Sequence, residues 1–263
     1  MGDAEILKDG ATVTEAQEEG GSVGSEPGLG GHVSAPGPSS NDWLTWQLVD
    51  SLLPTGGFAH SLGVEAAQQA GLLRGPSGLR DFLVSSLENV GALLLPFVYA
   101  GYQVGSISEW EELDAAMDAT LSNHVANEAS ATQGAALLRV VAGVHQGIAF
   151  FKEMRVHTRA SHGARSHHAP VFGVVCSRVG ISSATAQRAY LFMALRDMTS
   201  AATRLNLIGP LEAAILQGAL FPQAEAFAAL YSDRPIEDAR QTAPLLDIVQ
   251  GGQDRLFSRL FRS

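Results

Sequence analysis

The chain contains 263 residues, of which 46% are hydrophobic and 17% are charged, so it can bury one substantial core. Its formal net charge of −10 at pH 7 disfavours a broad nucleic-acid-binding surface, which requires clustered Lys and Arg side chains. The single cysteine, Cys176, excludes an intramolecular disulfide and a cysteine-based metal cluster, so we expect a cytoplasmic protein.

The first segment, residues 1–41, is rich in Gly, Ser, Pro and Glu and contains no aromatic residue. Without apolar periodicity it cannot bury enough surface to offset the entropy lost on ordering, so we predict a disordered acidic tail. It also lacks a basic stretch followed by an apolar one, so we do not expect a secretory signal. The remaining residues, 42–263, are predicted to form one domain.

The most distinctive segment places Pro54 and two glycines beside His60, between apolar helical patterns. Pro54 fixes its own φ and moves the residue before it out of the α region. Gly56 and Gly57 allow positive φ or a close approach of the backbone. We therefore predict a shaped turn at which one helix ends and another begins.

The next pattern predicts an amphipathic helix. Apolar residues recur there at intervals of three and four, which places them on one helical face: Leu79, Phe82, Leu83, Leu87, Val90 and Leu94. The apolar run 90–104 follows, but Pro96 and Gly101 interrupt it and it is shorter than the ~20 residues that cross a bilayer. We predict a buried core helix and no membrane contact.

A helix is predicted over residues 108–121, beginning with a capping box in which Ser108 and Glu111 satisfy free N–H groups. Its carboxylates could be interpreted as a catalytic cluster: Glu109, Glu111, Glu112, Asp114 and Asp118. The helix dipole favours acids in a first turn in any case, so we interpret them as a solvated face.

Two long helices follow. Apolar spacing over residues 125–144, with few charges, predicts a helix packed against several neighbours. Ser182 or Ser183 can cap a second helix that runs to about residue 205, and the Gly-Pro pair at 209–210 is expected to end it.

Shorter helices are predicted over 211–220 and 222–231, with Pro222 in the first turn of the second one. No segment alternates apolar and polar residues, and no hairpin turn signal occurs. The fold class is therefore predicted to be all-α, a single compact helical bundle of about ten helices.

Four histidines could provide metal ligands, because neutral imidazoles bind zinc and nickel: His157, His162, His167 and His168. Their spacing matches no zinc motif and no cysteine lies near them, which favours a solvated loop and leaves His167 and His168 as weak metal candidates. A helical metalloenzyme or metal carrier that uses this cluster is the alternative function.

Other catalytic signals are weak. Ser61 and Cys176 could act as nucleophiles, but neither lies in a Gly-x-Ser-x-Gly elbow, and Cys176 is interpreted as a core residue. The chain has no phosphate-binding loop and no dinucleotide-binding glycine motif. No catalytic residue is predicted.

The last ten residues, 254–263, interleave Arg with bulky apolar residues, notably Arg259, Leu260 and Phe261. This composition is suited to docking in a partner's groove. It is equally typical of a terminal helix that packs on its own domain.

Residues 50–65, Asp-Ser-Leu-Leu-Pro-Thr-Gly-Gly-Phe-Ala-His-Ser-Leu-Gly-Val-Glu, resemble the signature stretch of the urease accessory protein F family. Residues 168–173, 200–205 and 258–263 are also similar to stretches of that family, so the resemblance covers about 42–263. One departure is Gln253, which stands where family members often have His. The positions matched to the family's interface or structural motifs are Pro54, Thr55, Gly56, Gly57, Phe58, His60, Ser61, Glu65, Arg259, Leu260 and Phe261.

The resemblance implies an all-α homodimer that binds the urease accessory protein called D or H (the D/H protein) and recruits the GTPase accessory protein G. Together these proteins deliver nickel to apo-urease. The family member is implied to be a scaffold and not an enzyme, with no tightly bound cofactor. Nickel is handled by the assembled complex, and the scaffold is implied to regulate the GTPase or to let nickel pass.

Overall fold

The computed structural model describes residues 40–160 and 164–263, which belong to one compact unit spanning 38–263. Every regular element in these residues is a helix, which confirms the predicted all-α fold. The predicted tail, 1–41, lies outside the described residues except for Ser40 and Asn41, which open the first helix.

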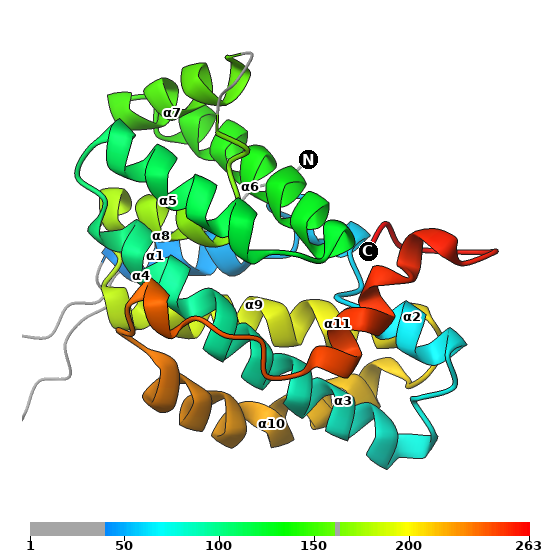
Figure 1. The fold of residues 1–263 in the computed structure, drawn as a ribbon. Helices are drawn as coiled ribbons and strands as arrows, with labels where there is room; N and C mark the ends of the chain where they lie inside the picture. The colour runs from blue at the N-terminus through cyan, green and yellow to red at the C-terminus, as the bar shows by residue number, and fades with distance from the viewer. Residues whose placement is uncertain (1–39, 161–163) are drawn as a thin grey trace, which may run out of the picture. The chain divides into compact units, whose positions relative to one another are not determined.

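The α-helices are numbered in chain order (Figure 1): α1 Ser40–Val49, α2 Val64–Gln69, α3 Gly75–Asn89, α4 Leu95–Gln103, α5 Ile107–Thr120, α6 His124–Val144, α7 Ala149–Arg159, α8 His168–Val179, α9 Ser183–Arg204, α10 Pro210–Tyr231 and α11 Pro244–Gly251. Short 3₁₀ turns lie at Gly57–Ala59, Ile236–Asp238 and Gln253–Arg255. Figure 1 shows α5, α6 and α7 on one side of α8 and α9, with α3 and α10 on the opposite side.

Helix α8 is the centre of the core. All its residues from Ala169 to Cys176 are buried, and it packs closely along α4. Glycines allow this approach: a Cβ on Gly101 would overlap the carbonyl of Pro170, and one on Gly173 would overlap the carbonyl of Val98. Cys176 is fully buried, which confirms its interpretation as a core residue.

Helices α3 and α4 form one continuous helical rod joined by a π-helical turn at Val90–Leu94. Pro96 has no N–H to donate to the carbonyl of Ala92, four residues earlier. That carbonyl instead accepts the backbone N–H of Arg240 at 3.2 Å, which ties the segment after α10 to the rod. The predicted core helix is confirmed, because Val90, Leu95 and most of the following residues are buried.

Two stretches of the described residues are long and apolar enough to cross a membrane by length and composition alone: Ser77–Gln103 and Pro210–Tyr231. In the first, 56% of the most apolar window is buried inside the protein, as expected of a core helix. In the second, only 11% is buried.

The predicted start of α5 was two residues too late. The helix begins at Ile107, where the Ser106 hydroxyl accepts the N–H of Glu109 at 3.3 Å and the Glu109 carboxylate accepts the N–H of Gly105 at 2.8 Å. The same Ser-x-x-Glu spacing occurs at Ser106 and at Ser108, so the local pattern fits both positions. The earlier start is favoured because Ile107 then packs against the core.

The prediction of two helices after residue 210 was wrong, because α10 is continuous from Pro210 to Tyr231 with Pro222 inside it. Pro222 has no N–H, so the carbonyl of Gly218, four residues earlier, loses its helical partner. Both residues are exposed, so water can satisfy that carbonyl. The preceding helix, α9, ends at Arg204, and Pro210 opens α10 as its first residue.

Candidate functional site

The predicted turn in residues 50–65, called here the signature segment, is confirmed. Gly56 has a φ of +81°, a 3₁₀ turn occupies Gly57–Ala59, and α2 begins at Val64 after Gly63 with a φ of +88°. A Cβ on Gly57 would lie 3.0 Å from Oδ2 of Asp197 on α9, so the absence of a side chain lets this turn lie against that helix.

The end of the chain, residues 258–263, lies along the signature segment; it is called here the closing segment. The Ser61 N–H and hydroxyl both donate to the carbonyl of Ser263, at 2.5 and 2.8 Å. His60 Nδ1 lies 2.7 Å from the Ser263 hydroxyl, and the Arg262 N–H donates to the carbonyl of Ala59 at 2.8 Å. The two family-like stretches at residues 50–65 and 258–263 are therefore in direct contact.

Glu65 makes the central polar contacts of this site. Its side chain is buried, with 2% of the residue exposed, and its two carboxylate oxygens accept three hydrogen bonds. The donors are the Leu260 N–H at 2.5 Å, the Phe261 N–H at 3.0 Å and Gln253 Nε2 at 2.6 Å. Gln253 thus supports the carboxylate as an amide donor.

Arg204 at the end of α9 contacts both the signature segment and the closing segment. Its guanidinium lies 4.3 Å from the ring centre of Phe261 and 5.7 Å from that of Phe58, and it donates to the carbonyl of Phe58. Cation–π contacts of this kind favour a fixed arrangement of the three side chains. The arrangement buries Phe261, of which 3% is exposed, and leaves Phe58 65% exposed.

These positions correct part of the prediction for the chain end. The closing segment packs on its own domain, but not as a helix, because only a 3₁₀ turn at Gln253–Arg255 precedes it. Phe261 is buried in its own chain and is not free to enter a partner's groove, whereas Leu260 is 55% exposed and Arg259 is also exposed. Phe257, just before the segment, is fully exposed.

Burial controls the charge of His60. Loss of hydration, with a smaller effect of the nearby Arg262 charge, lowers the pKa of His60 from 6.5 to about 4. The imidazole is therefore neutral at pH 7 and can hydrogen-bond to the Ser263 hydroxyl without a buried charge. His60 and Ser61 both serve to hold the chain end.

The histidines predicted as possible metal ligands are dispersed. His157 on α7 pairs with Glu111 at 2.6 Å, and His162 lies outside the described residues. His167 Nε2 lies 3.2 Å from Asp118 Oδ1, whereas His168 Nδ1 lies 3.2 Å from the Tyr190 hydroxyl. Within residues 40–160 and 164–263, no three His, Cys, Asp or Glu side chains are grouped as metal ligands.

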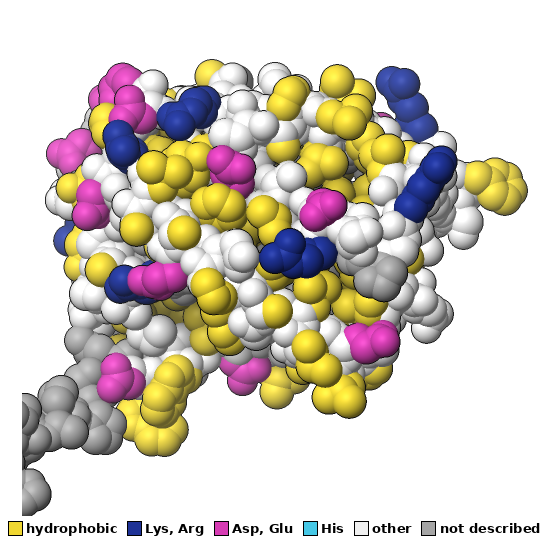
Figure 2. Space-filling model, turned by 90° about the horizontal axis from the view of Figure 1, so that it is seen from below, with side chains coloured by type: hydrophobic (Ala, Val, Ile, Leu, Met, Phe, Trp, Pro, Cys, Tyr) yellow, Lys and Arg dark blue, Asp and Glu magenta, His cyan; other side chains and the backbone are white. Residues whose placement is uncertain are grey.

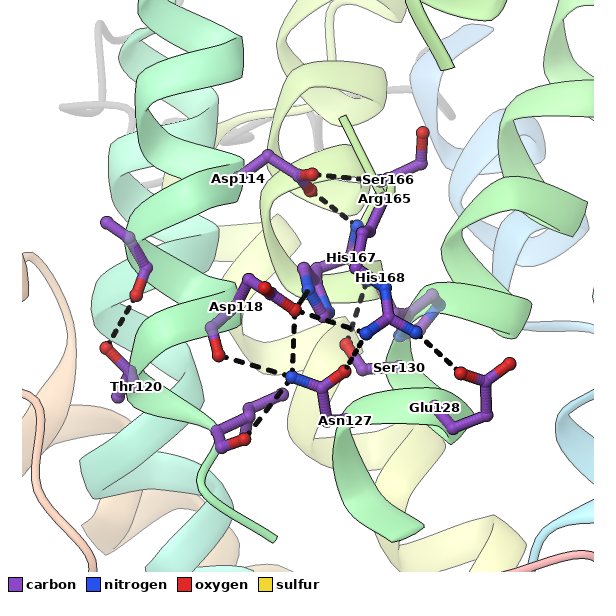
Figure 3. Close-up of polar contacts among 12 residues, drawn as sticks. Asp114, Asp118, Thr120, Asn127, Glu128, Ser130, Arg165, Ser166, His167 and His168 are labelled. Carbon is purple, nitrogen blue, oxygen red and sulfur yellow. Dashed lines mark hydrogen bonds and ion pairs between the residues drawn. The ribbon is translucent and has the colours of Figure 1, made fainter. Parts of the chain in front are cut away.

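Residues 165–168 are also held more firmly than the predicted solvated loop. Figure 3 shows side chains of α5 and α6 converging on the backbone at the start of α8. Asp114 accepts the N–H groups of Ser166 at 3.0 Å and His167 at 2.6 Å, and the Ser130 hydroxyl accepts that of His168 at 3.1 Å. The His168 N–H belongs to the first turn of α8, which leaves such groups without a helical partner, and the other two N–H groups lie just before the helix.

The interpretation of the α5 carboxylates as a solvated face was therefore wrong for Asp114, which is buried. Burial raises the pKa of the Asp114 carboxyl, and the N–H donors of His167 and Ser166 oppose that rise. Asp118 accepts from Asn127 at 2.9 Å and from Arg165 at 3.4 Å. Asp114 follows the buried Trp110 by four residues and so lies on the same face of the helix. This spacing was the sequence signal that could have indicated the burial of Asp114.

A cavity of about 140 Å³ lies beside the signature segment and was not predicted. Its walls include Gln133 of α6, His168 of α8, Tyr190 and Asp197 of α9, and Gln250 of α11. Burial raises the pKa of the Asp197 carboxyl, and the adjacent Arg196 guanidinium partly offsets this rise. Single polar residues within apolar helical stripes give little sequence signal of such an interior space.

Comparison with known proteins identifies the family. A family model named UreF matches residues 73–221. The urease accessory protein F of Oryza sativa subsp. indica is 49% identical over 219 residues, which cover 83% of this chain and 84% of the rice protein. That of Arabidopsis thaliana is 46% identical over 231 residues, covering 88% of this chain and 96% of the relative.

A bacterial relative extends the comparison. The urease accessory protein UreF of Paenarthrobacter aurescens strain TC1 is 33% identical over 225 residues, covering 82% of this chain and 96% of its own length. Plant and bacterial relatives thus match between 82% and 88% of the chain, in agreement with the family resemblance found in the sequence. The chain belongs to the urease accessory protein F family.

Proposed function

We propose that this protein is a cytoplasmic, non-enzymatic scaffold for urease maturation, which joins the D/H protein and the GTPase G protein during nickel delivery to apo-urease. The observation that carries the proposal is family membership, with relatives that match 83% and 88% of the chain. The relatives are named as urease accessory proteins, and no nucleic acid or membrane is needed as a partner in this role.

The exposed side chains around the signature segment support docking of the D/H protein. Phe58, Phe257 and Leu260 are exposed apolar residues, and exposed arginines lie among them at Arg204 and Arg259. Aromatic and Arg side chains are the residues most enriched at protein interfaces. This set of five residues is called here the docking surface.

The outer face of α10 supports the homodimer. Leu211 and Ile215 are 73% and 63% exposed, and the same side of the helix continues with small or apolar exposed residues: Gly218, Pro222, Ala226 and Ala229. Figure 2 shows hydrophobic side chains gathered between scattered charges on the side of the molecule where α10 and α3 lie. Small residues let two helices approach closely, so we propose that a second copy of this chain covers α10.

Nickel is cargo in this proposal and not a resident cofactor. We propose that the assembled complex holds it in transit, and that this chain acts on the G protein by positioning it. GTP turnover of the assembled complex, measured with and without this chain, tests the effect on the GTPase.

The decisive experiment is co-expression of apo-urease with its accessory proteins. We expect nickel-dependent urea hydrolysis when this chain is present and background hydrolysis when it is omitted. Equal activity without the chain, at matched urease levels and limiting nickel, would contradict the proposed role.

A further inference from the structure

The cavity beside the signature segment has the size and the lining of a small-molecule site. Its volume of about 140 Å³ is close to the ~150 Å³ of an engineered apolar cavity that binds one benzene molecule. Ligand sites are mostly apolar, with a few polar groups that fix the orientation of the ligand. The apolar side chains of this wall include Val90, Leu93, Leu121, Met193, Met198 and Leu246. One ring with a short substituent fits this space.

Two acceptor oxygens converge at the end of the cavity beside Gly57. Asp197 Oδ2 and Gln133 Oε1 lie 3.0 and 3.8 Å from the point that a Cβ on Gly57 would occupy, and both residues line the cavity. Within the described residues neither oxygen accepts a hydrogen bond. Arg196 donates twice to the other carboxylate oxygen, Oδ1, and the Gln133 amide uses its nitrogen to donate to the carbonyl of Ala129. This end of the cavity can therefore accept N–H donors.

His168 supplies a donor to the same cavity. The Tyr190 hydroxyl is buried, and its one partner within the described residues is His168 Nδ1 at 3.2 Å. The hydroxyl therefore donates to Nδ1, and the neutral imidazole carries its proton on Nε2. Nε2 has no partner in the described residues and keeps accessible surface, as expected of a ring that lines the cavity. It can donate to the carbonyl oxygen of a ligand.

The charges around the cavity favour a neutral ligand. The Asp197 carboxylate already has a counter-ion, because Arg196 Nη2 lies 2.7 Å from Oδ1. Burial lowers the pKa of His168 to about 4, with smaller effects of the His60 and Arg196 charges, so the imidazole is neutral at pH 7. A charged ligand would lose its hydration at this end of the cavity without meeting an unpaired opposite charge.

Helix α11 forms the part of the wall through which a ligand can enter. None of its residues is buried. Asn123 Nδ2 donates to the carbonyl and to the carboxylate of Asp247 at 2.8 and 3.1 Å, and the Thr242 N–H, just before α11, donates to Asn89 at 2.8 Å. An element with few buried contacts opens at a low cost in free energy.

We propose that this cavity binds a small, neutral primary carboxamide whose tail is an aromatic ring or an equally short apolar group. The NH2 group of the ligand donates to Asp197 and Gln133, its carbonyl accepts from His168, and its tail fills the apolar part of the cavity. This site is separate from the proposed role in urease maturation, and its tests need no partner protein.

The first test compares three probes of one shape on the full-length chain by titration calorimetry. Benzamide carries both hydrogen-bonding functions, acetophenone has a methyl group in place of the NH2 group, and benzamidinium has a cationic amidine in place of the amide. We expect benzamide to bind with a Kd of roughly 1 mM or lower, and the other two at least roughly tenfold more weakly. If benzamide does not bind at about 10 mM, the site does not exist. Equal or tighter binding of acetophenone or benzamidinium overturns the assignment of a neutral carboxamide.

The second test locates the bound probe. Ala126 lines the cavity, so Ala126→Leu should fill it and weaken benzamide binding at least roughly tenfold, whereas Ala115→Leu, at an exposed position of α5, should not. Gln133→Leu removes one acceptor from a partly exposed position, and should weaken benzamide roughly tenfold without weakening acetophenone. Benzamide binding that survives Ala126→Leu overturns the location. Binding that survives Gln133→Leu overturns the recognition of the NH2 group.

Discussion

Asp114 is the buried residue on which the start of α8 depends. Its carboxylate accepts hydrogen bonds from the main-chain N–H groups of Ser166 and His167, and within the described residues neither group donates to another acceptor. Asp114→Ala should therefore leave two buried donors unsatisfied and lower the free energy of unfolding by about 3 kcal/mol. Urea unfolding measures this loss.

The matched control for Asp114 is Glu112→Ala, on the same helix but exposed. Surface substitutions of this kind change stability by about 0.5 kcal/mol or less. If both variants lose the same small amount, the capping role of Asp114 is wrong.

His60 should make folding stability depend on pH. An unfolded histidine takes up a proton below about pH 6.5, but the depressed pKa of His60 keeps it neutral in the folded chain down to about pH 4. The unfolded state therefore binds more protons between these pH values, and stability falls as the pH drops through this window. We expect the unaltered chain to lose up to about 3 kcal/mol more than His60→Gln between pH 7 and pH 4.

Urea unfolding of the two proteins at several pH values measures this difference. Burial lowers the pKa of His168 to about 4 in both proteins, whereas the smaller effect of the His60 charge on His168 is lost in His60→Gln and forms part of the measured difference. Parallel stability curves for the unaltered chain and His60→Gln would show that His60 does not stay neutral on folding.

At the scale of elements, α10 carries the prediction for the homodimer. Leu211→Glu combined with Ile215→Glu places two charges on the proposed contact between copies, where they would be buried without partners. We expect the dimer to weaken at least roughly 100-fold, so that sedimentation shows a monomer at micromolar concentration. The melting temperature should change little, because both side chains are exposed in the single chain.

The control for α10 is Ile248→Glu, which introduces a charge at a residue of α11 that is 72% exposed. This variant should sediment like the unaltered chain. A double variant of α10 that keeps the mass of the unaltered chain would contradict the assignment of this face.

Helix periodicity predicted most elements because one buried stripe is enough to identify a helix. The apolar stripe predicted for α3 was confirmed, and Ser182, one of the two serines predicted as a cap, caps α9 by accepting the Thr185 N–H at 3.2 Å. Helix boundaries were predicted wrongly where the same local signal occurs twice, as at Ser106 and Ser108. They were also wrong at Pro222, where water can satisfy the carbonyl that the proline leaves without a donor. The contacts of Glu65 with the closing segment join residues 195 positions apart, and no local pattern encodes them.

At the scale of the whole molecule, different elements carry the two proposed interfaces. The exposed stripe of α10 is mostly apolar, and Glu225, which lies on it, is paired with Arg188, whereas the docking surface mixes apolar side chains with arginines in a chain of net charge −10. A mostly apolar face suits a second identical copy, because unpaired identical charges would repel across a two-fold axis. The basic and apolar docking surface suits a different protein with complementary acidic groups.

The chain as a whole should not retain nickel. His157 and His167 each contact a single carboxylate, and His168 contacts the Tyr190 hydroxyl. These three imidazoles therefore have separate partners and do not form one metal site. We expect the purified full-length chain, equilibrated with nickel and desalted, to keep less than about 0.1 equivalent by elemental analysis, because a stable nickel site needs several grouped ligands. His167→Ala and His168→Ala should leave this value unchanged and instead lower stability. One tight equivalent, lost in both variants, would favour the metal carrier and require His162, outside the described residues, to complete the site.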